Sequence, residues 1–418
     1  MSSDRRTEVI VFLDATELGP RRPVGVLGVT GGGKAIPSFT YARTWLQSND
    51  AFPIDPALPL VEPDQYVGAG RLPGIFADAA PDRWGRLLLD RRELAIARNE
   101  GRRPRSLRDW DYLLGVSDVG RMGALRLAGS PDADTFLDDH ETTIPPLARL
   151  RDLEQAALTL EKLGSVSPAQ EALIALLLAP GSSLGGTRPK ATFAAEDGAL
   201  WIAKFPSGND AREIGAWEFL LTELASRAGI SVPERRLLRL GPAGRTFAAA
   251  RFDRRVAGRR LYASAMTLTG RADGEDASYP EIAMAIADHA AADGIDTDLE
   301  QLFRRVVFNV LAANRDDHLR NHGFLRTPSG WRLAPAFDLN PAPEKPEHAL
   351  ALNGQDREPR LDLVLETSDW YRLGRSRARA IANEVSAAIA VWPSLARKLN
   401  LPAQEIAFIE TAVRGRIQ

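Results

Sequence analysis

The residues best suited to chemistry lie in a polar stretch at 314–321, which reads Asn-Arg-Asp-Asp-His-Leu-Arg-Asn. Asp316 and Asn321 have four residues between them. This is the D-x-x-x-x-N spacing of kinase catalytic loops, in which the Asp takes the proton of the attacking hydroxyl and the Asn binds metal. Taken alone, the stretch is equally typical of a polar turn after a helix, because Asn and Asp favour turns.

A further carboxylate, Asp338, follows a strand-like stretch at 331–337. Mg²⁺ prefers hard oxygen ligands, usually one or two carboxylates together with substrate phosphates. Asp338 and Asn321 therefore form a candidate metal pair. No glycine follows Asp338, so the D-F-G signature is absent and an ordinary turn is the alternative.

Phosphoryl transfer also needs positive charge and a cover over the phosphates. Residues 181–190 form a Gly-rich loop that contains Arg188 and Lys190, and the amides of such a loop can approach an anion, although most such loops are plain turns. Lys204 follows in an apolar strand-like run, where it either reaches phosphates or lies at a solvated sheet edge. Glu218, on the next expected helix, either pairs with that lysine or is an ordinary exposed carboxylate.

The order of these features favours one interpretation. A Gly-rich loop, a strand lysine, a helix glutamate, an Asp-x₄-Asn loop and an Asp after a strand follow one another as in kinases. Each signal alone is weak, and their order predicts phosphoryl transfer that depends on ATP and Mg²⁺.

Two other patterns are rejected. Residues 28–35 nearly match a phosphate-binding loop, but Ala35 lacks the hydroxyl that would bind Mg²⁺ and Pro37 disfavours the required helix, so a hairpin tip is expected. His318 and His322 stand four apart, as zinc ligands do on a helix, but a third ligand and the glutamate of the protease motif are missing. Both histidines are expected to be polar loop residues.

Length and composition set the broad class. The chain has 418 residues, so two domains are expected. A net charge of -2 gives no whole-protein argument for nucleic-acid or membrane binding. The absence of cysteine excludes disulfides and thiol chemistry and fits a reducing cytoplasm. No signal peptide or membrane-spanning run is expected, which predicts a soluble cytoplasmic protein.

The elements that position these residues are expected to be mixed α and β. Strand-like runs at 8–13 and 23–29 suggest a hairpin, and the acidic, Pro-containing stretch 129–146 predicts a boundary between domains at 1–140 and 146–418. The best helix, 297–313, has a capping box of Thr297 and Glu300. Its apolar face at helical spacing comprises Leu299, Leu302, Phe303, Val306, Val307, Val310 and Leu311. Further helices are expected at 81–94, 147–163, 168–178, 210–228, 376–392 and 402–414, and further strands at 121–129, 235–240 and 245–254, with a hairpin around residues 197–198.

These segments resemble the HipA family over nearly the whole chain. The resemblance rests on FTYARTWL (39–46), ADAAPDRWGR (77–86) and YLLGVSDVGRMGALRL (112–127), and then on SSLGGTRPKA, WIAKFP, WEFLLTELASRAGISVPE, RFDRR, NRDDHLRN and LAPAFDL. It implies an α+β fold, with a two-lobed protein-kinase-like domain preceded by a small α/β N-terminal subdomain. Two departures are Asp317, an extra acid where some members have Gly, and Ala250, where some have Glu.

The family resemblance also implies roles for individual residues. Asp316 would be the catalytic Asp, Asn321 and Asp338 the Mg²⁺ ligands and Glu218 a supporting residue. The implied ATP site comprises Gly185, Gly186, Thr187, Arg188, Lys190, Lys204, Ala250, Phe252, His318, Asn321, Phe337 and Asp338. Autophosphorylation is expected at Ser183 or the adjacent Ser182, because a phosphate with about 2 negative charges there would repel ATP.

The resemblance implies, finally, a serine/threonine protein kinase that acts as the toxin of a type II toxin–antitoxin pair. The expected partners are a HipB-like helix-turn-helix antitoxin, operator DNA reached mainly through that antitoxin, and a protein substrate such as glutamyl-tRNA synthetase. No membrane partner is expected. Two alternatives stay open: a small-molecule kinase on the same scaffold, and a catalytically dead co-repressor bound to the antitoxin.

Overall fold

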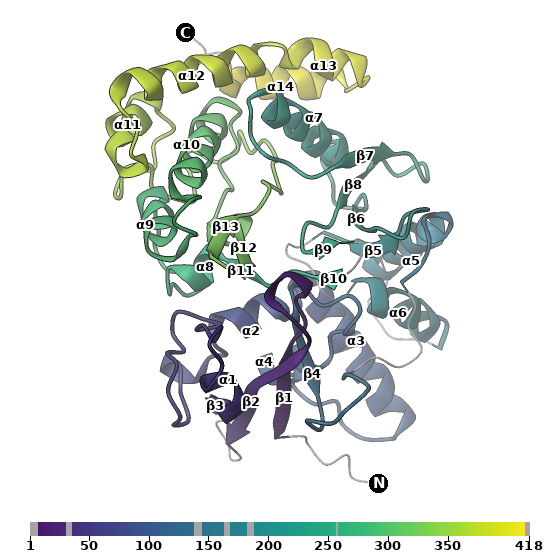
Figure 1. The fold of residues 1–418 in the computed structure, drawn as a ribbon. Helices are drawn as coiled ribbons and strands as arrows, with labels where there is room; N and C mark the ends of the chain where they lie inside the picture. The colour runs from purple at the N-terminus through teal and green to yellow at the C-terminus, as the bar shows by residue number, and fades with distance from the viewer. Residues whose placement is uncertain are drawn as a thin grey trace. The chain divides into compact units, whose positions relative to one another are not determined.

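The computed structural model describes residues 7–30, 36–137, 144–162, 168–181, 188–255 and 258–413. The chain divides into two compact units (Figure 1). The first comprises Met1–Gly208 and Asp253–Ala263, and the second comprises Asn209–Phe252 and Ser264–Gln418. This division by contacts differs from the boundary expected at 129–146, which stays a prediction about the N-terminal subdomain.

The first unit begins with an antiparallel sheet in the order β3-β2-β1-β4. Its strands are β1 (Glu8–Leu13), β2 (Arg22–Thr30), β3 (Ile36–Tyr41) and β4 (Leu125–Ala128). The predicted hairpin of the first two strands is confirmed, with Val9 opposite Leu27. In β1 the apolar residues Val9, Val11, Phe12 and Leu13 are buried, and Phe12 packs with Ala128 of β4 and Phe136.

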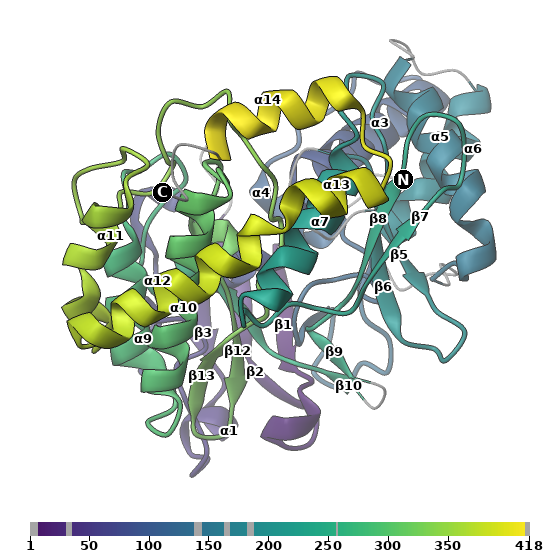
Figure 2. The ribbon, with the colours of Figure 1, turned by 90° about the horizontal axis from the view of Figure 1, so that it is seen from above.

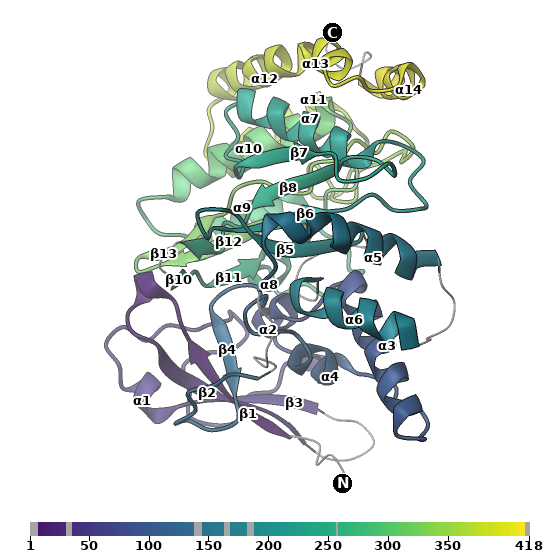
Figure 3. The same cartoon turned by 90° about the vertical axis from the view of Figure 1, so that its right-hand side faces the viewer.

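Helices and a second hairpin complete the first unit. The helices are α1 (Arg43–Leu46), α2 (Gly74–Ala79), α3 (Arg83–Asn99), α4 (Asp109–Leu114), α5 (Leu150–Lys162) and α6 (Pro168–Gly181), with short 3₁₀ turns at Thr16–Leu18, Gly68–Gly70 and Leu147–Arg149. The helix α6 packs against α3, α5 and β5 (Lys190–Ala194), as Figure 3 shows. The strand β5 forms the expected hairpin with β6 (Leu200–Lys204), and the turn has a glycine with φ of 82° at Gly198.

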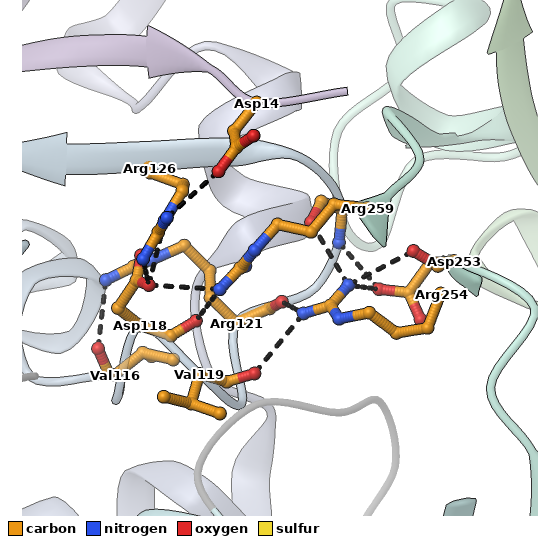
Figure 4. A network of polar contacts seen from close by, with 10 residues as sticks. Asp14, Val116, Asp118, Val119, Arg121, Arg126, Asp253, Arg254 and Arg259 are labelled. Atoms are coloured by element: carbon orange, nitrogen blue, oxygen red, sulfur yellow. Dashed lines mark hydrogen bonds and ion pairs between the residues drawn. The ribbon is translucent and has the colours of Figure 1, made fainter. Parts of the chain in front are cut away.

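A buried carboxylate organises the end of the N-terminal sheet (Figure 4). Asp118 is fully buried. It accepts hydrogen bonds from Nε of Arg126 at 2.9 Å and from Nη2 of Arg259 at 3.0 Å. Arg126 also pairs with Asp14 at 2.9 Å. One carboxylate thus ties strands β1 and β4 to a segment that lies far away in the sequence.

That segment begins in the RFDRR motif, which includes β9 (Arg254–Arg255), and continues through β10 (Gly258–Arg259) and β11 (Tyr262–Ser264). Asp253 accepts a hydrogen bond from the amide of Gly123 at 2.9 Å. The Arg254 guanidinium donates to the carbonyl oxygens of Arg121 at 2.5 Å and Val119 at 3.4 Å (Figure 4). Each of these contacts lies within the first unit, so residues 253–255 and 258–259 belong to it structurally although they follow strands of the second.

The second unit is mainly helical. Its elements are α7 (Ile214–Arg227), β7 (Arg235–Leu238), β8 (Thr246–Ala250), α8 (Ala265–Leu268), α9 (Tyr279–His289), α10 (Ile295–Leu311), β12 (Gly323–Thr327), β13 (Gly330–Leu333), α11 (Leu361–Glu366), α12 (Arg375–Ala390), α13 (Trp392–Lys398) and α14 (Ala403–Val413), with 3₁₀ turns η4 (Leu319–Asn321) and η5 (Ser368–Tyr371). The helix α12, yellow in Figure 2, packs against α10 and α7. Among the described residues, none of the helices combines the length and the apolar character needed to cross a bilayer.

The helix α10 is the core of the second unit. The whole predicted apolar face is buried, from Leu299 to Leu311. The predicted capping box at Thr297 is wrong, because the helix begins at Ile295 after Gly294 and Thr297 lies inside its first turn. A capping box is present instead on α9, between Ser278 and Glu281. The acids Asp296 and Asp298 near the start of α10 favour the earlier start through the helix dipole.

We expect Asp118→Asn to lower the stability of the first unit by about 3 kcal/mol near neutral pH, since it leaves buried arginines without their carboxylate. Burial by itself raises the pKa of Asp118, but Arg259 and Arg126 lower it more, so the pKa lies below its ordinary value. The carboxylate therefore stabilises the fold above the unfolded pKa of about 3.9, and this contribution is lost as pH falls through the lower folded value.

Urea unfolding of wild type and variant from pH 7 to pH 3 tests this. The difference between their free energies of unfolding should become smaller at the acidic end. The matched control is Asp152→Asn, which removes an exposed Asp–Arg pair and should cost less than about 1 kcal/mol. Equal losses of stability in Asp118→Asn and Asp152→Asn would contradict the role of Asp118 as an organising buried carboxylate.

Candidate functional site

The candidate site residues divide between the two units. Arg188, Lys190 and Lys204 belong to the first. Those of the second unit are Glu218, Ala250, Phe252, Asp316, His318, Asn321, Phe337 and Asp338. The remaining predicted residues, Ser182, Ser183, Gly185, Gly186 and Thr187, lie outside the described residues.

The loop with the D-x-x-x-x-N spacing starts where α10 ends. Ala313 adopts a left-handed conformation with φ of 56°, and the amide of Asn314 bonds the carbonyl of Asn309 at 2.9 Å. A left-handed residue ends a helix by turning the chain away from its axis. After this turn the exposure alternates: Asp316 and His318 are exposed, whereas Asp317 and Asn321 are buried.

Asp317 anchors the loop from its buried side. Its carboxylate accepts hydrogen bonds from the Tyr279 hydroxyl at 2.7 Å and from Nδ2 of Asn309 at 2.8 Å, and it meets Nε2 of His322 at 2.7 Å. Burial by itself raises the pKa of Asp317, but His322 and Tyr279 lower it by more. The pKa of Asp317 therefore lies below its ordinary value. The extra acid noted in the sequence thus faces the interior, unlike the neighbouring Asp316.

The two ends of the loop are held as well. Nδ2 of Asn314 donates to Oδ1 of Asn309 at 2.9 Å, and the amide of Ala265 donates to the carbonyl of His322 at 2.7 Å. Helices α9 and α10 and the start of α8 therefore fix a loop of which only alternate side chains face outward. This leaves Asp316 accessible on a rigid backbone, as a general base requires.

Asp338 follows the antiparallel hairpin of β12 and β13. The Arg305 guanidinium donates to the carbonyl of Ala334 at 2.5 Å, and the amide of Ala336 bonds the carbonyl of Ser231 at 2.7 Å. Asp338 itself has a φ of 60°, which is uncommon for a residue with a side chain. Such strain persists where surrounding structure enforces it, and it concentrates at functional sites.

An aromatic contact links two residues that the family resemblance puts in the nucleotide site. The rings of Phe252, after strand β8, and Phe337, before Asp338, lie 5.4 Å apart and are tilted by 37°. Ala250, at the end of β8, donates its amide to the carbonyl of Glu234 at 2.8 Å. The structure thus brings the predicted hinge next to the segment that leads into Asp338.

The donor set in the second unit fits Mg²⁺ better than zinc. Asn321 and Asp338 offer hard oxygen donors, and Mg²⁺ usually completes its octahedron with water and phosphate oxygens. Among the described residues, no cluster of three His, Asp or Glu side chains could hold a metal alone. A Mg²⁺ site that is completed by water and phosphate oxygens does not need such a cluster. Nε2 of His322 bonds Asp317, as a structural histidine would.

In the first unit, Lys190 and Lys204 are direct partners across the β5–β6 hairpin. Residues opposite one another in this way share a face, and like charges there repel. Lys190 is 1% exposed, and its Nζ lies 2.5 Å from Oδ2 of Asp82. Asp82 also caps α3, because it accepts the amide of Gly85 at 2.8 Å. Asp82 thus offsets the charge of Lys190, while Lys204 stands half-buried at the end of its strand.

Other charged residues near Lys190 and Lys204 in the sequence were also assigned from the sequence. Glu218 is 1% exposed on α7, so the alternative of an exposed surface carboxylate is wrong. Arg188 donates from Nη2 to the carbonyl of Phe205 at 3.0 Å, beside Lys204. Asp82 was missed from the sequence because it falls inside the helix expected at 81–94, whereas α3 begins at Arg83 and has Asp82 as its N-cap.

We expect Asp82→Asn to cost about 3–5 kcal/mol, because it leaves the Lys190 ammonium buried without a counter-charge while Asn keeps the helix cap. Burial raises the pKa of Asp82 even though Lys190 opposes the rise, so the buried charge is costly. The double variant Asp82→Asn with Lys190→Met should therefore recover most of the loss. Thermal unfolding of the three proteins checks this, and a double variant as unstable as Asp82→Asn would contradict it.

We expect Asp317→Asn to lower stability by about 3 kcal/mol and to loosen residues 314–322, because the amide cannot satisfy both His322 and Asn309. Hydrogen exchange should show the loop amides losing protection more than the rest of the unit. The control is Asp296→Asn, an exposed Asp on α10. Loop protection equal to that of the control would show that Asp317 does not anchor the loop.

Comparison with known proteins identifies the family. The model of the HipA-like C-terminal domain matches residues 182–392, and that of the HipA N-terminal domain matches residues 19–127. No curated protein matches the chain.

Two solved structures are similar to the chain. HipA of Shewanella oneidensis MR-1, in a complex with HipB and operator DNA, has a TM-score of 0.68 and 17% identity, covering 98% of this chain and 96% of its own. The proinflammatory kinase CtkA of Helicobacter pylori has a TM-score of 0.42 and 17% identity, covering 56% of this chain and 89% of its own. The first match supports the predicted fold class, an α+β kinase-like domain preceded by an α/β N-terminal subdomain. With both family models matched along its length, the chain belongs to the HipA family.

Proposed function

We propose that this protein is a cytoplasmic, ATP-dependent serine/threonine protein kinase that acts as the toxin of a type II toxin–antitoxin pair. The observation that supports this best is the loop at 314–321. Its backbone is anchored by the buried Asp317, so that Asp316 faces outward in a HipA-family chain. A rigidly held, accessible carboxylate is what a general base for hydroxyl activation requires.

Each residue has a role in the proposed reaction. Bound Mg-ATP supplies the phosphoryl group and the metal charge that offsets its phosphates. Asn321 and Asp338 would hold the Mg²⁺, and Asp338 is already fixed in a strained backbone conformation. Asp316 orients the Ser or Thr hydroxyl of the substrate and accepts its proton.

The remaining residues would bind the nucleotide. Lys204 would contact the phosphates, with Glu218 supporting it, and Gly185–Lys190 would cover them. Phe252 and Phe337 pack against one another and would line the adenine side, together with the backbone of Ala250. His318 is exposed on the same loop as Asp316 and would also contact the nucleotide.

The partners follow from the family. The Shewanella relative was solved with HipB and operator DNA, and we extend this to a HipB-like helix-turn-helix antitoxin that carries the complex to DNA. A translation component such as glutamyl-tRNA synthetase is the proposed target. Phosphorylation of Ser183 or Ser182 would silence the kinase, since the added charge repels ATP phosphates.

We expect purified protein incubated with Mg-ATP to gain phosphoryl groups, seen as an intact-mass shift that maps to Ser183 or Ser182. Asp316→Asn should slow this by about 10²–10⁴-fold, the usual contribution of a general base, and Asp338→Asn should abolish it. Asp296→Asn, at an exposed position on α10, is the matched control and should react as wild type.

The other outcomes separate the alternatives. ATP turnover that labels no protein, in the presence of a cell extract, would favour a small-molecule kinase. Neither ATP binding nor phosphorylation would favour a catalytically dead co-repressor. Full activity of Asp316→Asn would contradict the catalytic assignment.

A further inference from the structure

The exposed Asp316 has a partner that the family resemblance did not indicate. Nζ of Lys345 forms an ion pair with Oδ1 of Asp316. Lys345 does not belong to the catalytic loop, since it lies in the segment after Asp338 and 29 positions beyond Asp316. Two separate stretches of the second unit therefore converge on one carboxylate.

The backbone that bears Lys345 is fixed directly to the loop that bears Asp316. The amide of Ala342 donates to the carbonyl of Ala313 at 2.9 Å, and the amide of Ala349 donates to the carbonyl of Arg315 at 2.9 Å. Lys345 thus lies between two backbone contacts with the loop. The segment that bears Lys345 is therefore hydrogen-bonded to the loop both before and after this residue.

Arg315 adds a third attachment. Its Nη1 donates to the carbonyl of Pro343 at 3.2 Å and also to the carbonyl of Lys345 itself. Burial lowers the pKa of Arg315, which means that keeping its charge against these carbonyls costs free energy. The side chain before Asp316 in the sequence thus fixes the main chain of the residue that pairs with Asp316.

This arrangement has little value as a stabilising contact. The side chains of Lys345 and Asp316 are 43% and 59% exposed, and ion pairs this exposed contribute little to stability. A partly buried arginine and two backbone hydrogen bonds are more than such a pair needs. The geometry is better explained by a need to hold the Asp316 carboxylate in one orientation.

We propose that Lys345 is a positioning residue for Asp316 in phosphoryl transfer, an inference that rests on the function proposed above. Its ammonium binds Oδ1 and leaves Oδ2 to face the substrate hydroxyl. In the reaction, the hydroxyl oxygen forms a bond to the γ-phosphorus, and the bond from that phosphorus to the bridging oxygen breaks. The electron pair of the broken bond leaves with ADP, and the hydroxyl proton passes to Oδ2. Lys345 takes no part in the proton transfer.

The test compares Lys345→Met with Lys345→Arg, which keeps the charge, and with Lys398→Met, an exposed lysine on α13 that serves as the matched control. The readouts are the single-turnover rate of γ-phosphoryl loss from saturating Mg-ATP, to the protein or to water, and the Kd for Mg-ATP. We expect Lys345→Met to slow transfer by about 10–100-fold, because misplacing a reacting group by 1 Å can cost 10²-fold. The Kd and the melting temperature should stay close to wild type, and Lys345→Arg should recover most of the rate.

A double-variant cycle separates positioning from a general charge effect. In the Asp316→Asn background, Lys345→Met should cause little further loss, because the carboxylate that it orients has gone. Independent, additive losses would overturn the proposal. So would an unchanged rate in Lys345→Met, or a faster one, which would make the ion pair an inhibitory contact.

The parallel wild-type reaction keeps the two hypotheses apart. Transfer by wild type that depends on Asp316 but not on Lys345 would overturn this inference alone. Absence of transfer by wild type would overturn the proposed function and this inference with it.

Discussion

The second unit depends on one buried carboxylate, that of Asp317. A charge removed from water must be paired and hydrogen-bonded, or the fold loses several kcal/mol. Asp317 meets this demand with the hydroxyl of Tyr279 from α9, the amide of Asn309 from α10 and the ring of His322 from the far end of its own loop. Since any other arrangement would leave the charge without partners, the loop and both helices are restricted to one relative geometry. The orientation of Asp316 follows from this, because the next residue, Asp317, is held by its buried partners.

Two residues close to this loop have a strained backbone. Ala313 and Asp338 both have positive φ, although neither is glycine, and such conformations cost of order 1–3 kcal/mol. Ala313 turns the chain from α10 into the loop, and its carbonyl accepts the amide of Ala342, four residues beyond Asp338. The two strained positions thus belong to stretches that bond one another. The favourable pairing of Asp317 and the buried core of α10 offset the cost, so that strain is retained at Asp338, which is proposed to bind the metal, and at Ala313, which leads into the loop of Asp316.

Local patterns were enough to predict much of this from the sequence. The apolar face of α10, the hairpin around Gly198 and the strand of Lys204 come from periodicity and turn chemistry within a few residues, and the structure has them. The start of α10 was misplaced because two signals compete there, a Thr–Glu spacing and the acids of an earlier first turn. The partners of Lys190 and Asp316 could not be predicted, since they stand 108 and 29 positions away and meet only through tertiary packing. The family resemblance puts Lys190 in the ATP site, and nothing in the local sequence indicates that it also pairs with Asp82.

Family membership and site chemistry answer different questions in this protein. At 17% identity to the Shewanella HipA structure over nearly the full length, what is shared is the fold, and a fold alone does not determine chemistry. The chemistry has to come from side chains. Around Asp316, the proposed general base, these come from separate elements: Asp317 and its partners on the buried side, and Lys345 from the segment after Asp338. An exposed general base needs its position fixed without being buried, because burial would cost it access to substrate. Two features meet both requirements: the residues before and after Asp316 are anchored, and Lys345 pairs one of its carboxylate oxygens from a third direction.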